Sequence, residues 1–376
     1  MRKRILIFSI AYEPMVGGAE LAVRNITDRL PSYEFDLITC RFGKKDLAEQ
    51  KIGNVMVYRV GFGSRLGRYL YPVLALRLAS RLHRKKAYGI VWSIMAAYAG
   101  AAALMFKRRF PDVKFLLTLQ EGDSVPHIHK QVRGFQKHWQ QVFKKADYIQ
   151  AISQYLADWA KAEGAACPME VVPNGVTLSF FSPLIRGRLR GGRNSKFVII
   201  TTSRLVPKNG IDVLIKAVTE LKTLIRDTRY LIRIVGSGPD EKKLKDLARG
   251  LNVDHLIEFV GEVSPDEIPE YLSQADLFVR PSRSEGLGSS FLEAMAAGLP
   301  VVGTAVGGIP DFLKDGETGF LAKVDDPKDL AQKIHLLLED KNLYSKLSAN
   351  GKKLVEKNYD WNKIANCMEK IFSTLN

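Results

Sequence analysis

Short apolar runs alternate with stretches of helical spacing along the first half of the chain. In the helical stretches, such as Ala19–Leu30 and Gln154–Glu163, apolar residues recur every three or four positions. The apolar runs have the length of buried strands, and they are Arg4–Ile10, Phe35–Thr39, Val55–Val60, Ile90–Ile94, Lys114–Leu119, Tyr148–Ala151 and Glu170–Val172. Strands that alternate with helices of this length predict parallel pairing and a doubly wound α/β sheet.

The same pattern starts again in the second half, after an interruption. The dipeptide Asn174–Gly175 and the glycine-bearing stretch from Pro183 to Arg193 favour turns over packing. The strands expected beyond them are Phe197–Thr202, Tyr230–Val235, Ile257–Val260, Leu277–Val279 and Pro300–Gly303. We therefore predict one Rossmann-like domain over residues 1–183, a second over 194–356, and a final segment, 357–376, with helical spacing. Two such domains facing a central cleft would bind ligands at the carboxyl ends of their strands.

Two apolar segments could also be interpreted as a signal peptide and as a membrane-spanning helix. The N-terminal segment has a basic start, but its apolar run is only about seven residues long and meets no small-residue cleavage site, which favours a buried first strand over a signal peptide. The uncharged stretch Ile90–Phe106 has 17 residues, below the roughly 20 that span a bilayer. It predicts a buried strand followed by a tightly packed helix.

The positive charge of the chain is concentrated in its first half. The net charge is +16, with +18 in residues 1–200 and −2 in residues 201–376, and residues 51–100 hold nine basic side chains and no acidic one. This asymmetry indicates a polyanionic partner: an anionic membrane surface, a phosphorylated acceptor or a nucleic acid. Nucleic acid is the least favoured, because no recognition motif accompanies the basic residues.

The basic, leucine-rich stretch Ser64–Lys86 has two interpretations. Part of it could form an amphipathic helix lying on an anionic membrane. The favoured alternative is a solvated helix that packs its leucines on the core of the first domain, and Pro72 argues against one continuous helix.

Composition narrows the class of protein further. Apolar residues make up 46% and charged residues 26% of the chain, which is typical of a soluble globular protein. Three widely separated cysteines indicate a reducing, cytoplasmic setting, with peripheral attachment to the cytoplasmic face of a membrane as a variant of it. His127 and His129 lie near Glu121 and Asp123, but a metal site needs three or four converging ligands, so we expect no metal and no cofactor.

The strongest candidate for a ligand-binding site is the segment of residues 285–302, EGLGSSFLEAMAAGLPVV. A strand, a glycine-bearing loop and the start of a helix follow one another there. Gly286 and Gly288 would let the backbone approach a ligand closely, and the unpaired N–H groups of the helix start attract phosphate.

Two glutamates bracket this phosphate site. Glu285 precedes the helix, and Glu293 lies one turn into it, on the same face as Ser289. Carboxylates accept hydrogen bonds from paired hydroxyls, as in a ribose or a sugar ring. A phosphate site between two hydroxyl acceptors indicates a nucleotide-sugar. The alternative, an ordinary surface loop feeding a helix, leaves this combination unexplained.

The segment resembles the donor-binding signature of the retaining family-4 glycosyltransferases, which have the two-Rossmann GT-B fold. The resemblance extends over nearly the whole chain and follows the order of that family. Its other segments are Gly17-Gly18-Ala19-Glu20, Val172-Pro173-Asn174-Gly175-Val176, Ser203-Arg204-Leu205-Val206-Pro207-Lys208-Asn209-Gly210, Gly307-Gly308-Ile309-Pro310-Asp311 and Asp315-Gly316-Glu317-Thr318-Gly319-Phe320-Leu321.

The resemblance implies a role for each matching residue on the donor side. Arg204 and Lys208 would neutralise the departing diphosphate. Glu285 would hold the hydroxyls of the donor sugar, and Glu293 would hold the ribose. The phosphates would be bound by Gly286, Leu287, Gly288, Ser289 and Ser290.

The remaining implied roles concern the other parts of the chain. Gly18, with Gly17 before it, would close over the phosphates from the first, acceptor-side domain, and the last helix would cross back to that domain. Gln120 and Glu121 would face the sugar. For Gly236, in the turn Gly236-Ser237-Gly238, contact with the nucleotide base and a purely structural turn are equally supported. The implied substrates are a nucleotide-sugar, with UDP or GDP favoured, and a glycan or lipid-linked acceptor, without metal.

The chain departs from the family pattern at two positions. Many relatives have lysine directly before the glycine of the phosphate turn, where this chain has Asn209, so we assign the cation to Lys208. Many relatives also have histidine where this chain has Gln120, whose amide cannot take up a proton at neutral pH. This substitution disfavours the main alternative enzymes on the fold, a sugar-nucleotide epimerase or hydrolase. A non-catalytic nucleotide-sugar-binding protein is the other alternative, against which the joint presence of Arg204, Lys208, Glu285 and Glu293 argues.

Overall fold

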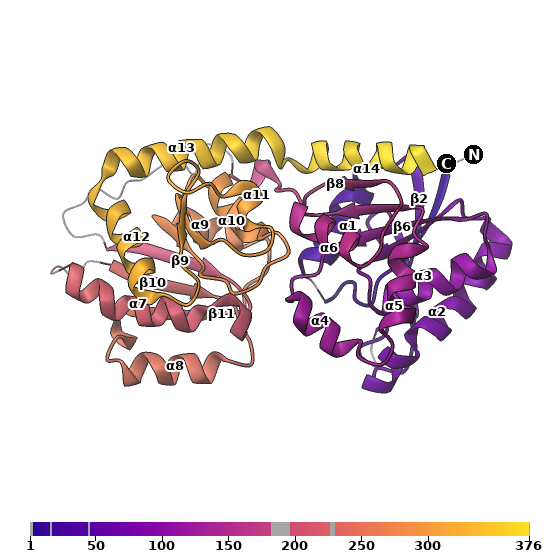
Figure 1. Cartoon of the computed structure of the whole chain (residues 1–376), viewed down its shortest axis with the longest axis horizontal. Helices are drawn as coiled ribbons and strands as arrows, with labels where there is room; N and C mark the ends of the chain where they lie inside the picture. The colour runs from indigo at the N-terminus through magenta and orange to yellow at the C-terminus, as the bar shows by residue number, and fades with distance from the viewer. Residues whose placement is uncertain (1–2, 16, 44–45, 182–195, 226–229, 376) are drawn as a thin grey trace. The chain divides into compact units, whose positions relative to one another are not determined.

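The structure is a computed structural model that describes residues 3–15, 17–43, 46–181, 196–225 and 230–375, with the side chains of Arg65 and Leu66 left aside. The chain divides into two compact units (Figure 1). The first comprises Met1–Asn174 and Trp361–Asn376, and the second comprises Gly175–Asp360. The predicted interruption from Pro183 to Arg193 lies outside the described residues.

The first unit is built on an eight-stranded sheet in the order β3-β4-β2-β1-β5-β6-β7-β8. Its strands are β1 (Lys3–Phe8), β2 (Tyr33–Cys40), β3 (Glu49–Ile52), β4 (Val55–Val60), β5 (Ile90–Ile94), β6 (Lys114–Leu119), β7 (Tyr148–Ala151) and β8 (Met169–Val171). All neighbouring strands pair in parallel except β3 and β4, which are antiparallel.

Helices pack on both faces of this sheet because alternate residues of a strand point to opposite sides. They are α1 (Gly18–Asp28), α2 (Arg65–Lys86), α3 (Tyr98–Arg109), α4 (Val125–Gln131), α5 (Gln136–Lys144), α6 (Gln154–Ala162) and α14 (Trp361–Leu375). Ile5 and Ile7 of β1 belong to the core shared with α1 and α14, whereas the ring of Phe8 meets Phe106 of α3, with centroids 6.1 Å apart. The last helix is held by its apolar stripe, with Phe372 packed on Trp92 at 5.3 Å.

The second unit is a smaller version of the same architecture. Its six-stranded sheet has the order β11-β10-β9-β12-β13-β14, and every pair is parallel. The strands are β9 (Phe197–Thr202), β10 (Tyr230–Val235), β11 (Ile257–Gly261), β12 (Leu277–Val279), β13 (Val301–Thr304) and β14 (Phe320–Ala322). The helices are α7 (Ile211–Leu224), α8 (Glu241–Gly250), α9 (Ile268–Ser273), α10 (Ser289–Ala296), α11 (Ile309–Phe312), α12 (Pro327–Glu339) and α13 (Lys341–Asn358). The predicted α/β class with two doubly wound parallel sheets is thus confirmed.

The interpretation of the two apolar segments is also confirmed. Residues 3–8 form the buried central strand β1, and the stretch Ile90–Phe106 divides into strand β5 and the buried part of helix α3. Close packing explains the small residues of α3, because a Cβ atom on Gly100 would lie 2.8 Å from a methyl group of Val142. Within the described residues, no helix has the length and apolarity needed to cross a membrane.

One local expectation was wrong, and two strands, β3 and β14, were not predicted. Pro72 does not interrupt its helix, because α2 runs unbroken from Arg65 to Lys86. A proline removes a single backbone donor, and the neighbouring Tyr71 anchors this part of the helix by donating its buried hydroxyl to the carbonyl of Ile38 at 2.7 Å. Strand β3 escaped prediction, since its exposed and polar sequence has no apolar alternation and its pairing with β4 alone makes it a strand.

Candidate functional site

The loops at the carboxyl edge of the second sheet pack against one another through glycines. Gly210 ends the loop that follows β9 and has a φ of +68°, and a Cβ atom there would lie 1.9 Å from the carbonyl oxygen of Pro281. Gly307 has a φ of +53° and is packed as closely as Gly210, since a Cβ atom added there would lie 1.7 Å from the carbonyl oxygen of Glu285. Only glycine fits these positions. The segment 280–288 is therefore fixed from two sides.

The turn between β9 and α7 presents the two predicted cations. Arg204 is exposed, and Lys208 is half-buried in the short turn Pro207–Asn209. Asn209 is buried and donates its side-chain amide to the carbonyl oxygen of Arg204 at 2.6 Å. Asn209, which departs from the family pattern, thus stabilises the turn through a buried hydrogen bond. Gly236 lies next to this turn, at the end of β10, and its N–H donates to the carbonyl of Gly261 at 2.7 Å.

The segment after β12 is joined to this turn through its backbone. The N–H of Arg283 donates to the carbonyl oxygen of Lys208 at 2.6 Å, and the guanidinium of Arg283 donates to the carbonyl oxygen of Pro207 at the same distance. The two predicted donor-binding segments therefore form one framework, although more than 70 residues separate Pro207 from Arg283 in the chain.

Glu285 lies in this framework against a buried arginine that we did not single out from the sequence. The guanidinium of Arg280 donates to the Glu285 carboxylate at 2.7 Å and to the Ser290 hydroxyl at 2.7 Å. Arg280 is only 6% exposed, and its guanidinium lies 4.9 Å from the ring centroid of Phe291. A charged residue directly after a fully apolar strand was the signal that could have found it.

Helix α10 begins at the predicted position, and it and the loop before it carry the other residues predicted to bind the donor. Gly288 precedes it with a φ of +100°, and Gly286 and Leu287 are buried beside it. Ser289 and Ser290 occupy the first turn, where backbone N–H groups lack helical partners. Glu293 follows one turn later. Burial raises the pKa of its carboxyl to about 7, and the positive charge of Arg280 partly offsets this effect.

Several buried polar groups at this edge have no partner within the described part of the chain. They are the hydroxyls of Thr202, Ser203 and Ser282 and the Nε of Arg280. Native proteins rarely leave such groups unsatisfied, so a cluster of them needs an explanation, such as ordered water or a ligand. The cluster lies at the carboxyl ends of the adjacent strands β9 and β12, where α/β sheets bind ligands.

In the first unit, the predicted glycine pair forms the start of helix α1. Gly17 is the N-cap of the helix and its N–H donates to the Glu20 carboxylate at 2.9 Å. Gly18 is the first helical residue, and a Cβ atom there would meet nothing within 4 Å. The space beside Gly18 is thus open.

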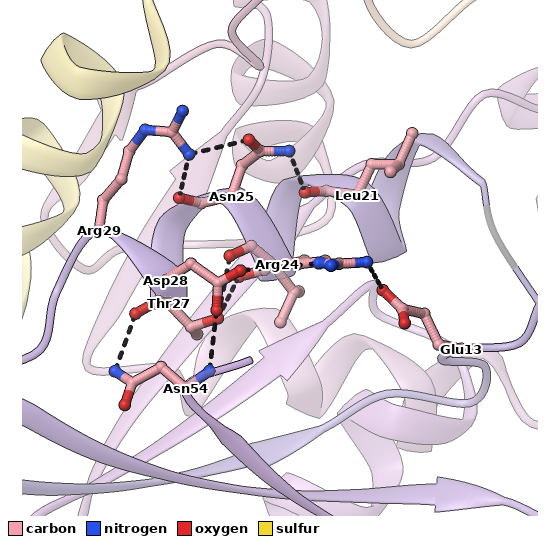
Figure 2. A network of polar contacts seen from close by, with 9 residues as sticks. Glu13, Leu21, Arg24, Asn25, Thr27, Asp28, Arg29 and Asn54 are labelled. Atoms are coloured by element: carbon pink, nitrogen blue, oxygen red, sulfur yellow. Dashed lines mark hydrogen bonds and ion pairs between the residues drawn. The ribbon is translucent and has the colours of Figure 1, made fainter. Parts of the chain in front are cut away.

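A polar network anchors helix α1 along its length (Figure 2). Arg24 donates to Glu13 at 2.7 Å, and Asn54 reaches the far end of the helix, where its N–H donates to Asp28 at 2.8 Å and its side chain donates to the carbonyl of Thr27 at 2.9 Å. These contacts fix the helix from the loop after β1 and from the turn between β3 and β4. The helix that starts at the glycine pair is therefore anchored at its middle and at its C-terminal end.

Gln120 and Glu121 follow β6 at the carboxyl edge of the first sheet. Gln120 is buried, and its side-chain oxygen accepts a hydrogen bond from the amide of Asn174 at 3.2 Å. The Glu121 carboxylate accepts from the N–H groups of Ala96 at 2.7 Å and of Gln120 at 2.9 Å. Burial raises the pKa of Glu121 to about 7 even though these N–H groups act in the opposite direction.

The predicted residues thus fall into two groups. Arg204, Lys208, Gly236, Glu293 and the segment 285–290 gather on neighbouring strands of the second sheet. The second group lies at the carboxyl edge of the first sheet and consists of Gly17, Gly18, Gln120 and Glu121. The histidines near Glu121 serve other contacts, with His127 bonded to Gln131 and His129 to Glu163. Within the described residues, no group of His, Cys, Asp or Glu has the arrangement of a metal site.

Solved structures share this architecture over the full chain. The sucrose-phosphate synthase of Thermosynechococcus elongatus superposes with a TM-score of 0.85 at 22% identity, covering 100% of this chain and 99% of that one. Anabaena HepE, solved in complex with UDP and glucose, superposes with a TM-score of 0.81 at 23% identity, covering 99% of this chain and 100% of that one. The fold is GT-B, the two-domain architecture of one large class of glycosyltransferases.

Sequence comparison identifies the family. The model of glycosyltransferase family 4 matches residues 16–180, and the model of the group 1 glycosyl transferases matches residues 190–354. The chain belongs to the family-4, group 1 glycosyltransferases. An uncharacterised glycosyltransferase of Methanocaldococcus jannaschii is 27% identical over 99% of this chain and 98% of its own length.

A relative whose name states an activity matches over a shorter region. The GDP-mannose-dependent alpha-(1-6)-phosphatidylinositol monomannoside mannosyltransferase of Mycolicibacterium smegmatis is 33% identical over 228 residues. The match covers 57% of this chain and 59% of the relative.

Proposed function

We propose that this enzyme transfers a hexose from a UDP- or GDP-sugar to a lipid-linked or glycan acceptor, with retention of configuration at the sugar carbon. The observation that carries the proposal is the framework at the carboxyl edge of the second sheet. It combines a half-buried carboxylate at Glu285, the start of helix α10 and the cationic turn with Arg204 and Lys208.

Each part of the framework suits one part of a nucleotide-sugar. The cations of the turn and the N–H groups of the first turn of α10 are complementary to a diphosphate. Glu285 is an acceptor for the hydroxyls of the transferred sugar, and Glu293 is an acceptor for the ribose. Two relatives support this class of donor, since one is GDP-mannose-dependent and another binds UDP and glucose.

The proposed reaction needs no nucleophile from the protein. The bond between the anomeric carbon and the diphosphate oxygen breaks, and the acceptor oxygen forms its bond to the same face of that carbon. The proton of the acceptor hydroxyl passes to the departing phosphate. Arg204 and Lys208 would stabilise the negative charge that grows on the diphosphate, which is the task a metal ion performs in other transferases.

A donor screen tests this proposal. Thermal unfolding is followed with UDP-, GDP-, ADP- and dTDP-sugars, and nucleotide release is then measured with the stabilising donor and a lipid-phosphate acceptor. We expect one nucleotide class to stabilise the protein and the reaction to persist in EDTA, and the one-bond carbon–proton coupling constant at the anomeric carbon of the product, read by NMR, to indicate the same anomeric configuration as in the donor. If no nucleotide-sugar stabilises the protein, the proposal is wrong.

The acceptor side of the proposal rests on the surface of helix α2. Exposed apolar residues lie just before this helix, at Phe62, and in its first half, at Tyr69, Leu70 and Val73. Arg77, Arg81, Arg84 and Lys85 are exposed further along it, and none of them has an ion-pair partner among the described residues. An apolar end beside a basic row is complementary to the interface of an anionic membrane. We therefore propose that the enzyme meets a lipid-linked acceptor at such a surface.

Vesicle sedimentation tests this part separately. Wild-type protein should sediment with vesicles that contain phosphatidylglycerol but not with pure phosphatidylcholine. Reversing Arg77, Arg81 and Arg84 to glutamate should abolish binding, since each basic residue near an anionic surface contributes about 1 kcal/mol. Reversal of the exposed Lys341, Lys346 and Lys353 of α13 is the matched control, with the same change of charge. Equal loss in both variants would leave only a general effect of net charge.

A further inference from the structure

Arg280 has an unusual position for a charged residue. It follows strand β12, its own N–H still pairs with the carbonyl of Val302 at 3.0 Å, and its side chain is almost completely buried. Burying a guanidinium removes it from water, and a buried ion pair stabilises a fold no better than well-packed apolar residues do. The stability of the fold therefore gives no reason for an arginine at this position.

The short side-chain hydrogen bonds of Arg280 both involve the proposed donor site. One terminal nitrogen donates to the Glu285 carboxylate at 2.7 Å. The other donates to the Ser290 hydroxyl at 2.7 Å and makes a longer contact of 3.4 Å to the carbonyl of Thr202. The guanidinium lies over the ring of Phe291, which fixes its plane. One planar fork thus binds two side chains from opposite sides of the loop 286–289.

The fork determines what these two side chains can offer to a ligand. The Ser290 oxygen accepts from Arg280, so the serine proton is directed elsewhere and can be donated to a phosphate oxygen. Arg280 binds one oxygen of Glu285, Oε2, which leaves Oε1 as an acceptor for a sugar hydroxyl. Lysine could not do both, because its ammonium lacks a fork of fixed geometry.

We propose that Arg280 is the positioning residue of the donor site. It orients Glu285 as an acceptor towards the sugar and Ser290 as a donor towards the phosphates, and its effect passes through these two side chains. This inference rests on the proposed function of Glu285 and goes beyond it, because it assigns the geometry of the site to a residue outside the donor signature.

The experiment compares Arg280→Met, Arg280→Lys, Glu285→Gln and the double variant Arg280→Met/Glu285→Gln in full-length protein. The donor is the nucleotide-sugar that stabilises the wild type most, and kcat and KM are measured for it. Removal of a residue that orients another typically lowers activity about 10- to 100-fold. We expect Arg280→Met to lower kcat by that factor, Arg280→Lys to recover part of it, and the double variant to lose less than the product of the two single losses, because part of the effect of Arg280 passes through Glu285.

Arg233→Met is the matched control. Arg233 lies on β10 of the same sheet and pairs with Glu258 at the same distance of 2.7 Å, but its contacts are outside the donor site. We expect wild-type kinetics for this variant. Thermal unfolding of every variant distinguishes loss of the fold from loss of the donor-site geometry. If Arg280→Met does not fold, Arg280→Lys takes its place, because it keeps the positive charge.

The outcomes distinguish this inference from the proposed function. If the wild type binds no nucleotide-sugar, the proposed function itself is wrong. If Glu285→Gln is impaired while Arg280→Met, or Arg280→Lys where only that variant folds, has wild-type kinetics, the positioning role alone is wrong. The orientation of Glu285 by Arg280 is overturned if the losses of Arg280→Met and Glu285→Gln multiply in the double variant, because Arg280 would then act independently of Glu285.

Discussion

Asp212 accepts two hydrogen bonds from the guanidinium of Arg283, each 2.8 Å long. Asp212 lies in the first turn of α7, and Arg283 lies in the loop after β12, so the pair joins the two segments that carry the proposed phosphate and sugar contacts. The same guanidinium also binds Asp325 at 2.6 Å. The pair explains how a turn that contains Lys208 is held at a fixed distance from Glu285.

We predict that Arg283→Met lowers the free energy of unfolding by about 1 to 3 kcal/mol, because it leaves a half-buried carboxylate and a backbone carbonyl without their donor. Binding of a nucleoside diphosphate should weaken as well, since the turn loses its support. Chemical denaturation and titration calorimetry measure the two effects. Lys216→Met is the control, because Lys216 pairs with Asp212 at 3.6 Å and is half exposed, so its loss should change stability by less than about 0.5 kcal/mol.

The pair of Asp212 and Arg283 should also make the free energy of unfolding depend on pH. Burial acts to raise the pKa of Asp212, but the hydrogen bonds and charge of Arg283, with the charge of Lys216, lower it below its ordinary value. A carboxyl with a lowered folded-state pKa stabilises the fold fully above its unfolded pKa of about 3.9, and the contribution disappears as the pH falls through the lower folded value. The difference in unfolding free energy between wild type and Asp212→Asn should therefore shrink towards low pH. A constant difference would contradict this account.

We predict that donor binding weakens below neutral pH because of Glu293. Its pKa is raised to about 7 by burial, and only the ionised carboxylate accepts from both ribose hydroxyls. The affinity for a nucleotide-sugar should fall by up to about tenfold for each pH unit below that value. Calorimetry between pH 5.5 and 8.5 measures it, with a nucleotide-sugar as ligand because its doubly esterified diphosphate does not titrate in this range. The Glu293→Gln variant should bind more weakly and without this pH dependence.

We predict that Gly307→Ala impairs transfer, whereas Gly316→Ala does not. Both glycines have positive φ values, +53° and +72°, so alanine at either position carries a backbone strain of about 1 to 2 kcal/mol. Only at Gly307 would the new Cβ atom also collide with the carbonyl oxygen of Glu285; at Gly316 it would meet nothing within 4 Å. Activity per folded molecule, measured beside thermal unfolding, should therefore fall only for Gly307→Ala. Equal activity of the two variants would show that the backbone at Glu285 tolerates displacement.

We predict that Gln120→Ala changes the choice of donor sugar and also destabilises the first unit. The substitution leaves the buried amide of Asn174 without its acceptor, which costs about 1 to 3 kcal/mol. The ratio of kcat/KM for two nucleotide-sugars with the same base should change, while the affinity for the free nucleotide stays as in the wild type. A loss of free-nucleotide affinity as large as the change in sugar preference would contradict a role on the sugar side.

Most of the elements were predictable because the signals that specify them are local. The strand of residues 277–279 and the helix that starts at Ser289 follow from an apolar run, two glycines and a helical pattern within about twenty residues. The same local order of motifs was enough to recognise the family. Strand β3 and the continuity of helix α2 through Pro72 were not predictable, since each depends on a partner from another part of the chain.

The sequence by itself determined the fold class, the family and the residue types that we propose surround a nucleotide-sugar. Only the tertiary structure decided which residues hold them in place. Arg280 reaches Thr202 across 78 positions, and Arg283 reaches Asp212 across 71. The physical reason is that a buried charge is stable only beside partners of suitable geometry, and parallel strands bring those partners together from distant parts of the chain.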